Sequence, residues 1–163
     1  MSAFVLDTNV LVVANNRQGE YDEMPDCIEA CVECLNDAKA GLVLLDDLGL
    51  IWAEYEKHAR YSGEPGLGDY FFRWLYERQG NINHLRKIAI RPHESLGFEN
   101  FPADSDLSGF DEDDRKFVAV ALAFEGDAVI YNAVDSDWWH YRASLEKYGL
   151  VIEFLCPDEA NAW

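Results

Sequence analysis

The chain has 163 residues, of which 49% are hydrophobic, and a formal net charge of −18, which together indicate one globular domain over residues 1–163 and exclude a disordered chain. No apolar run is long enough to cross a bilayer and no basic segment precedes the first apolar stretch, so we expect a cytoplasmic protein with no membrane partner. The negative charge disfavours unguided binding to nucleic acid, although metal ions and a local basic strip would still allow it.

The first half of the chain alternates short apolar runs with helical patterns. Asp47 is the expected N-terminal cap of one helix, and Gly41 and Gly63 are the expected helix stops. In chain order we expect a strand over 3–6, a helix from about 9, a turn-rich connection over 17–26, a helix over 26–41, a strand over 42–46, and helices over 47–63 and 67–80.

The second half continues this alternation after a stretch without a clear pattern, over 81–109. In chain order we expect a strand or extended edge over 85–92, a loop over 94–109, a helix from 111 to about 125, a strand and its exit over 127–135, a helix over 136–149 and a last strand over 150–157.

Strands that alternate with helices, and that lack a polar face, predict a mainly parallel sheet covered on both sides. We therefore expect an α/β fold, a three-layer α/β/α sandwich. Ligands of such folds bind at the carboxyl ends of the strands, so residues that follow strands are the first candidates for a functional site.

Three of the four cysteines, Cys27, Cys31 and Cys34, have the spacing C-x3-C-x2-C, which is also found in radical-SAM iron–sulfur enzymes. Here the three cysteines share one face of a predicted helix with apolar residues. With Cys156 distant in sequence and no fourth ligand nearby, we interpret them as buried structural thiols rather than a metal site.

Four carboxylates distant in sequence are expected to meet at one edge of the sheet. Asp7 and Asp135 each follow a predicted strand. Asp114 lies at the start of a helix, and Glu54 lies about two turns inside another, and both helices start at the edge where strands end.

Each of these acids also has a structural interpretation. Acids from Asp111 to Asp114 favour a helix N-terminus, and Asp111 is the expected cap. Glu54 can pair with Lys57 or His58, and Asp135 with Asp137 can make a turn. Asp7 has the least structural need, because it follows four apolar residues directly. Calcium loops that start at Asp114 or Asp135 are disfavoured, because neither has glycine at the required position.

Clustered carboxylates repel one another unless a cation joins them, and hard oxygen ligands suit Mg²⁺ or Mn²⁺. Such an ion can orient or ionise the water that attacks a phosphodiester and can offset charge on the leaving oxygen. The pattern therefore predicts metal-assisted phosphodiester hydrolysis.

Four segments, in this order, resemble PIN-domain ribonucleases of the VapC-like toxin class: FVLDTNVLV, WAEYEKH, DEDDRKFVAVALA and NAVDSDWW. The resemblance implies a PIN-like, Rossmann-like sandwich and a Mg²⁺- or Mn²⁺-dependent endonuclease that acts on RNA. It also implies an antitoxin partner and homodimerisation, which are common in the class. The catalytic and metal-binding acids that it implies are Asp7, Glu54, Asp114 and Asp135, with Asp137 as a frequent additional ligand and Asn9 as support for Asp7.

The chain departs from the family at Ala133, where a Thr or Ser is usual; Asn132 or Ser136 are the alternatives for that hydrogen bond. No motif identifies the residues that bind RNA. The basic residues that we consider as candidates for contacts with RNA phosphates lie between residues 60 and 91. They are Arg60, Arg73, Arg78, Arg86, Lys87 and Arg91, and they would otherwise be scattered charges that keep the chain in solution.

Two other functions stay open on the sequence. A haloacid-dehalogenase-like phosphatase also places an Asp after its first strand, but its acid–base Asp would fall at Asn9, which cannot transfer a proton. A catalytically silent PIN-like binding module would keep the fold without a coupled carboxylate site.

Overall fold

A five-stranded parallel sheet forms the centre of the computed structural model, which describes residues 2–160. The strand order is β3-β2-β1-β6-β7, so the first strand of the chain is the middle strand of the sheet. The strands are β1 (Ala3–Leu6), β2 (Leu42–Asp46), β3 (Leu85–Ile88), β6 (Ala128–Asn132) and β7 (Val151–Phe154).

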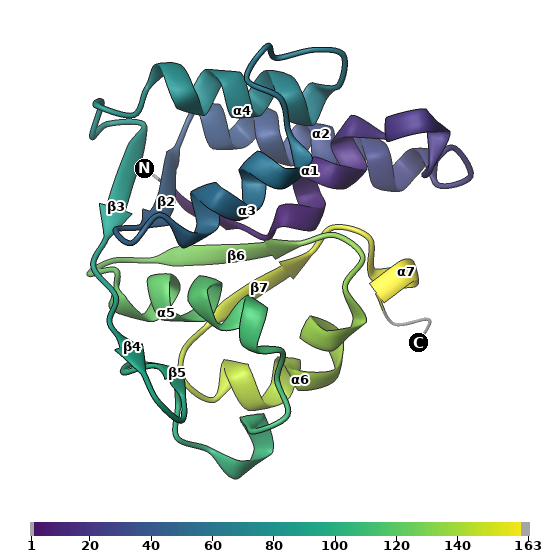
Figure 1. The fold of residues 1–163 in the computed structure, drawn as a ribbon. Helices are drawn as coiled ribbons and strands as arrows, with labels where there is room; N and C mark the ends of the chain where they lie inside the picture. The colour runs from purple at the N-terminus through teal and green to yellow at the C-terminus, as the bar shows by residue number, and fades with distance from the viewer. Residues whose placement is uncertain (1, 161–163) are drawn as a thin grey trace.

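Helices cover both faces of this sheet, as Figure 1 shows, and the expected three-layer α/β/α sandwich is confirmed. One group lies on the side of the sheet opposite α5 and α6: α1 (Thr8–Asn15), α2 (Pro25–Lys39), α3 (Leu50–His58) and α4 (Leu67–Glu77). On the other side, α5 (Arg115–Ala123) contacts β1, β2 and β6, and α6 (Ser136–Glu146) contacts β7, which α7 (Pro157–Ala160) follows.

The sequences of β1 and β2 do not alternate between polar and apolar residues, because both faces of these strands are buried. Every residue of β1 and β2 is buried, because helices cover both of their faces. The outer strand β7 instead alternates exposed and partly buried residues.

The helix after β2 differs from its expected bounds. It begins at Leu50 rather than Asp47 and ends at His58 rather than Gly63. Asp46 binds its first turn instead, because its carboxylate accepts hydrogen bonds from the backbone N–H groups of Leu48, Leu50 and Ile51 at 3.1, 2.9 and 2.8 Å. Asp47 accepts the N–H of Ile90 at 3.1 Å and so ties β2 to the chain after β3.

The stretch expected to be a loop over 94–109 contains more structure than that. A short antiparallel pair, β4 (Pro92–His93) and β5 (Gly97–Phe98), lies within and just before it, followed by the 3-10 turn η2 (Ser105–Leu107). The buried guanidinium of Arg115 orders this segment, because it donates to four backbone carbonyls at 2.9–3.4 Å. These carbonyls belong to Leu96, Leu107, Ser108 and Phe110.

The cysteines are only partly the free thiols expected. Cys31 and Cys34 are buried thiols, as predicted, but Cys27 forms a disulfide with Cys156 across a sequence separation of 129 residues. The bond joins the first turn of α2 to the residue just before α7. Closing a loop of this length stabilises a fold by about 4–5 kcal/mol in the chain-entropy account. Disulfides are commoner in oxidising compartments, so the cytoplasmic location stays a prediction.

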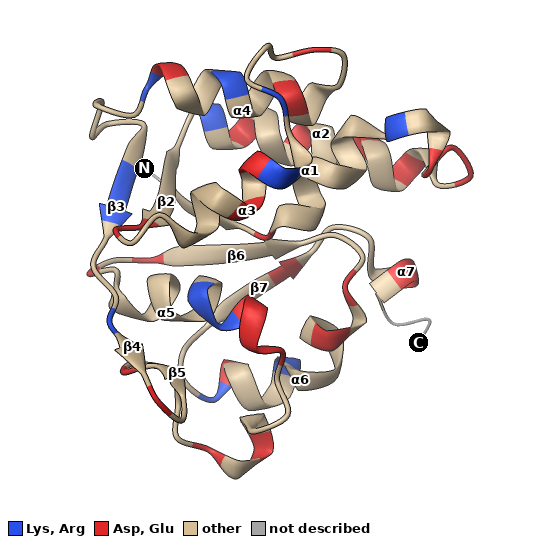
Figure 2. Cartoon of the chain, in the orientation of Figure 1, with Lys and Arg blue, Asp and Glu red and all other residues tan. Residues whose placement is uncertain are grey.

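Acidic residues lie on both sides of the sheet in the described part of the chain (Figure 2). Among residues 2–160, no helix combines the length and the apolar character that a membrane crossing requires. On α4, Phe71 is fully buried, whereas Tyr70 and Tyr76 are exposed.

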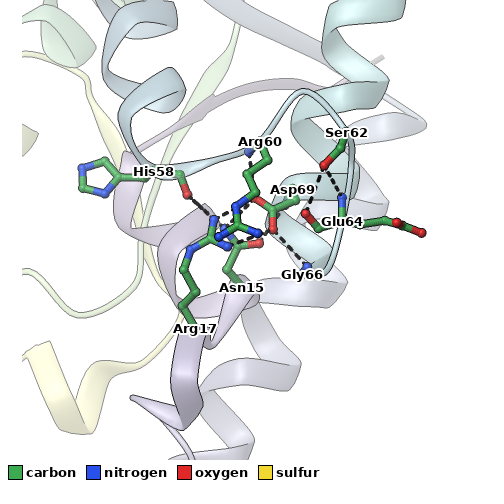
Figure 3. A network of polar contacts seen from close by, with 8 residues as sticks. All are labelled: Asn15, Arg17, His58, Arg60, Ser62, Glu64, Gly66 and Asp69. Carbon is green, nitrogen blue, oxygen red and sulfur yellow. Dashed lines mark hydrogen bonds and ion pairs between the residues drawn. The ribbon is translucent and has the colours of Figure 1, made fainter.

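A buried carboxylate joins α1, α4 and the loop before α4 (Figure 3). Asp69 is fully buried and pairs with Arg17 at 2.9 Å. It also accepts the backbone N–H groups of Arg60 and Gly66 at 2.8 and 3.0 Å, and the side-chain amide of Asn15 at 3.3 Å. The carboxylate of Asp69 therefore links α4 to the end of α1 and to the loop between α3 and α4.

We expect Asp69→Asn to destabilise the fold by about 2–4 kcal/mol, because an amide nitrogen would face backbone N–H groups that need an acceptor and Arg17 would lose its partner. Chemical denaturation measures this. The matched control is Glu77→Gln on the same helix, whose exposed pair with Arg73 is 3.6 Å long and should be worth less than about 0.5 kcal/mol. Equal effects of the two substitutions would contradict the assignment.

Candidate functional site

Two of the predicted acids follow the ends of neighbouring strands. β1 pairs with β6 in parallel, from Ala3 opposite Ala128 to Leu6 opposite Tyr131. The backbone N–H of Asp7 continues this ladder to the Tyr131 carbonyl at 3.0 Å. Asp7 and Asp135 therefore leave the same edge of the sheet, as the sequence predicts, and the charge of Asp135 acts on Asp7.

The third acid, Asp114, reaches this edge through a 3-10 turn rather than from the middle of a continuous helix. The turn η3 (Glu112–Asp114) precedes α5, and Asp111 caps it as expected by accepting the N–H of Asp113 at 3.0 Å. Asp114 is buried where α5 begins, and the charges of Asp7 and Asp135 both act on it.

Two carboxylate oxygens of this cluster are buried without a hydrogen-bond donor. Asp7 is 4% exposed and Asp114 is 8% exposed. Within residues 2–160, Oδ1 of Asp7 and Oδ2 of Asp114 have no hydrogen-bond partner within bonding distance, and neither does the buried Nε1 of Trp138, whose side chain lowers the pKa of Asp7. Nearly all buried polar atoms in folded proteins have a partner, so these two oxygens are candidates to bind a ligand or ion.

Burial and mutual repulsion make both carboxyls weak acids. Burial raises the pKa of Asp7 to about 7, opposed by the Asn9 N–H and assisted by the charges of Asp135 and Glu54. Burial also raises the pKa of Asp114 to about 9, and the charges of Asp7 and Asp135 add to it. A divalent cation between them would favour the charged forms of both.

Asp7 also has a structural role, which the sequence did not indicate. Its Oδ2 accepts the backbone N–H of Asn9 at 3.2 Å, so Asp7 is the N-terminal cap of α1. Asp135 likewise caps α6 by accepting the N–H of Asp137 at 2.9 Å. In Asp7, Oδ2 therefore caps the helix, and Oδ1 is the oxygen that can bind a ligand.

Asn9 supports the site through the backbone of the neighbouring strand. Its side-chain amide donates to Oδ1 of Asn132 at 2.8 Å, and its Oδ1 accepts the N–H of Ala133 at 2.9 Å. The fully buried Asn132 in turn donates to the carbonyl of Asp135 at 3.2 Å. Asn132 thus supplies a polar link next to Ala133, the position where the family usually has Thr or Ser.

Glu54 is held by residues that the sequence analysis missed. Its Oε1 pairs with Nζ of Lys116 at 2.8 Å, and its Oε2 accepts the hydroxyl of Thr8. Lys57 and His58, the partners considered from helical spacing, are not the partners found here. Lys116 and Thr8 each lie next to or near a predicted acid, but only the fold shows that both point at Glu54.

Asp137 lies at the border of the cluster. Its Oδ2 accepts the backbone N–H of Asp111 at 3.0 Å, which joins the starts of η3 and α6. Burial raises its pKa, opposed by that N–H and assisted by the charge of Asp135.

The acids of the described chain do not form a tight preassembled cage for an ion. Within residues 2–160, the group whose ligand atoms all lie within 4.8 Å of one another is Cys27, Cys31 and Cys156, and two of these are joined by the disulfide. Sulfur ligands do not suit Mg²⁺ or Mn²⁺. The unpartnered oxygens of Asp7 and Asp114 do suit these ions.

Comparison of the chain with protein-family models, with curated proteins and with solved structures finds no match. The likeness to PIN-domain ribonucleases therefore rests on the four sequence segments and on where the fold places their acids.

The raised pKa values predict how the stability of the metal-free chain depends on pH. Both values lie above the ordinary 3.8, so the folded chain retains protons that the unfolded chain has lost. The two groups contribute stability below about pH 4 that is lost as the pH rises through about 7 and about 9. We expect Asp7→Asn/Asp114→Asn to gain stability over the wild type, by a few kcal/mol, between about pH 5 and about pH 9.

Denaturation of both chains in chelator measures this difference and cancels the titration of other groups. Added Mn²⁺ should then stabilise the wild type near pH 8 and leave the variant unchanged. A difference between the chains that does not change with pH would show that the fold does not raise the pKa values of these two carboxyls.

Proposed function

We propose that the protein is a metal-dependent endoribonuclease that hydrolyses RNA phosphodiester bonds, with Mg²⁺ or Mn²⁺ as its cofactor. The observation that carries the proposal is the pair of buried, unpartnered carboxylate oxygens on Asp7 and Asp114 at the carboxyl edge of the sheet. The order of the four PIN-like segments supports it.

The acids of the site would contribute differently to binding the ion. Asp7 and Asp114 each offer one free, buried oxygen, and Asp135 lies close enough for its charge to act on both. Glu54 and Asp137, whose oxygens already accept hydrogen bonds from the protein, add negative charge at the border. Asn9 and Asn132 fix the backbone from which Asp135 projects.

A bound Mg²⁺ or Mn²⁺ would supply an activated water and would offset the charge of the phosphate. The chain's own part is to hold carboxylates in a partly dry site, where their charge stays concentrated, and to keep them in place through the caps of α1 and α6.

The phosphatase alternative is less well supported by the contacts of Asn9. Both ends of its side-chain amide are engaged by Asn132 and Ala133, so the residue is a structural clamp rather than an acid or base. The silent binding module differs from the nuclease in its metal response, since it requires no coupling between ion binding and the acids.

Two adjoining hollows near Glu54 are candidate places for the RNA. One, of about 330 Å³, is lined by Glu54, Lys116 and Asp113. The other, of about 380 Å³, is lined by Arg17, His58 and Arg60. Lys57 lines both, so Arg17, Lys57 and Arg60 form a basic strip beside Glu54. Glu20 and Glu56 also line the second hollow, and Arg17 is paired with Asp69, so Lys57 and Arg60 are the main candidates for phosphate contacts. Phosphates along this strip would have favourable contacts despite the net charge of the chain.

The other basic residues considered from the sequence have different surroundings. Arg73 pairs with Glu77, Arg78 lies over the ring of Trp74, and Arg86 lies over Phe124. The toxin role, an antitoxin that inserts a basic side chain into the acidic site, and a homodimer stay parts of this proposal.

We expect Asp7→Asn and Asp114→Asn each to lower Mn²⁺-dependent RNA cleavage by at least about 100-fold, because each removes one of the two free oxygens. Gel assays on a structured RNA, with chains purified free of other nucleases, measure the rate. Asp127→Asn is the matched control, because it makes the same chemical change at an exposed residue just before β6, at the opposite edge of the sheet, and should cleave at close to the wild-type rate. Undiminished cleavage by both site variants would overturn the proposal.

The basic strip can be tested apart from cleavage. In an Asp114→Asn background, we expect Lys57→Glu/Arg60→Glu to weaken RNA binding at least about tenfold and to reduce its salt dependence. Fluorescence anisotropy measures this. Arg86→Glu/Arg91→Glu makes the same change in net charge elsewhere and should weaken binding much less. Equal losses would mean that only the overall charge matters.

A further inference from the structure

Lys116 places a buried positive charge inside the acidic cluster. The residue lies on α5, two positions after Asp114, and its side chain is 10% exposed. Its Nζ is 2.8 Å from Oε1 of Glu54 and also donates to the backbone carbonyl of Asp113. Because lysine is rarely buried without a partner, this arrangement is a specific ion pair and not a solvated surface charge.

The cluster therefore has two unlike halves. Both oxygens of Glu54 have protein donors, Lys116 on one and the Thr8 hydroxyl on the other. Within the described residues, Oδ1 of Asp7 and Oδ2 of Asp114 have none. The chain itself neutralises the half at Glu54, whereas the half at Asp7 and Asp114 has oxygens that can bind an external cation.

We propose that Lys116 is a positioning residue that takes the place of a second divalent cation at Glu54, so that the site binds one ion, at Asp7, Asp114 and Asp135. This inference rests on the proposed metal site. Two-metal sites of hydrolases require carboxylates that serve two ions about 3.5–4 Å apart. Here the carboxylate that would hold the second ion is already saturated by an ammonium group.

The surroundings of Nζ are those of a small hard cation. The oxygens around it are a carboxylate and a backbone carbonyl, both of which are ligand types of Mg²⁺ and Mn²⁺. The ammonium group also lines the hollow of about 330 Å³ beside the acids, so water or phosphate oxygens can complete a coordination shell there. Removing the ammonium while keeping Glu54 should therefore open a site that a second ion can enter.

Calorimetric titration of the metal-free chain with Mn²⁺, together with the electron paramagnetic resonance signal of the bound ion, tests this without any measure of cleavage. We expect one ion for the wild type, with the spectrum of an isolated Mn²⁺. Lys116→Met, similar in length but uncharged, should bind two ions, and the spectrum should show coupling between them. Lys116→Arg, which keeps the charge, should again bind one.

The double variant Glu54→Gln/Lys116→Met controls for general loosening of the site. It removes the carboxylate as well as the ammonium and should return to one ion. Circular dichroism and denaturation confirm that each variant is folded, and Lys116→Gln replaces Lys116→Met if the latter does not fold.

The outcomes separate this inference from the proposed function. Two ions in the wild type, or a single ion in folded Lys116→Met, even at higher affinity, would overturn the role of Lys116 and leave the metal site standing. No bound ion in any of the chains would instead overturn the metal-dependent function on which the inference rests.

Discussion

The pairing of β1 with β6 is the contact on which the rest of the molecule depends. It joins residues 3–6 to residues 128–131 in one parallel ladder, and the N–H of Asp7 extends it by one more bond to Tyr131. Just beyond the strands, Asn9 clamps Asn132 and the Ala133 backbone. The same register that completes the sheet therefore fixes the separation of the two acids that follow its strands.

Negative charge at this edge serves the fold and the site together. Asp7, Asp111 and Asp135 cap α1, η3 and α6, a position where the unpaired N–H groups of a helix favour a carboxylate. This stabilisation offsets part of the repulsion that the crowding creates. The remaining repulsion is greatest at Asp7 and Asp114. Their unpartnered oxygens and raised pKa values identify the part of the cluster that is suited to a cation.

Buried basic residues complete the arrangement on α5. Arg115 satisfies four carbonyls of the irregular segment before it, and Lys116 satisfies Glu54. Arg115 and Lys116 lie next to each other on α5, but their side chains bind different parts of the molecule. Arg115 orders the segment that leads into η3, and η3 sets the position of Asp114, so that stability and the candidate chemistry share a single stretch of sequence.

The sequence by itself determined the layered α/β fold and the sheet edge at which the acids gather, because apolar runs and helical spacing are local patterns that burial enforces wherever the chain lies. It also identified Asp111 as a cap. It missed the Cys27–Cys156 disulfide, the hydrogen bonds of Asp46 to the start of α3 and the Lys116–Glu54 pair. The disulfide and the ion pair join residues that are distant in sequence and that have many other possible partners, and the Asp46 bonds depend on the turn after β2. The partner of each side chain is set by how the elements pack, because packing brings distant residues together. As a result, the oxygens of Glu54 have protein donors, whereas Asp7 and Asp114 each have a buried oxygen without one in the described residues.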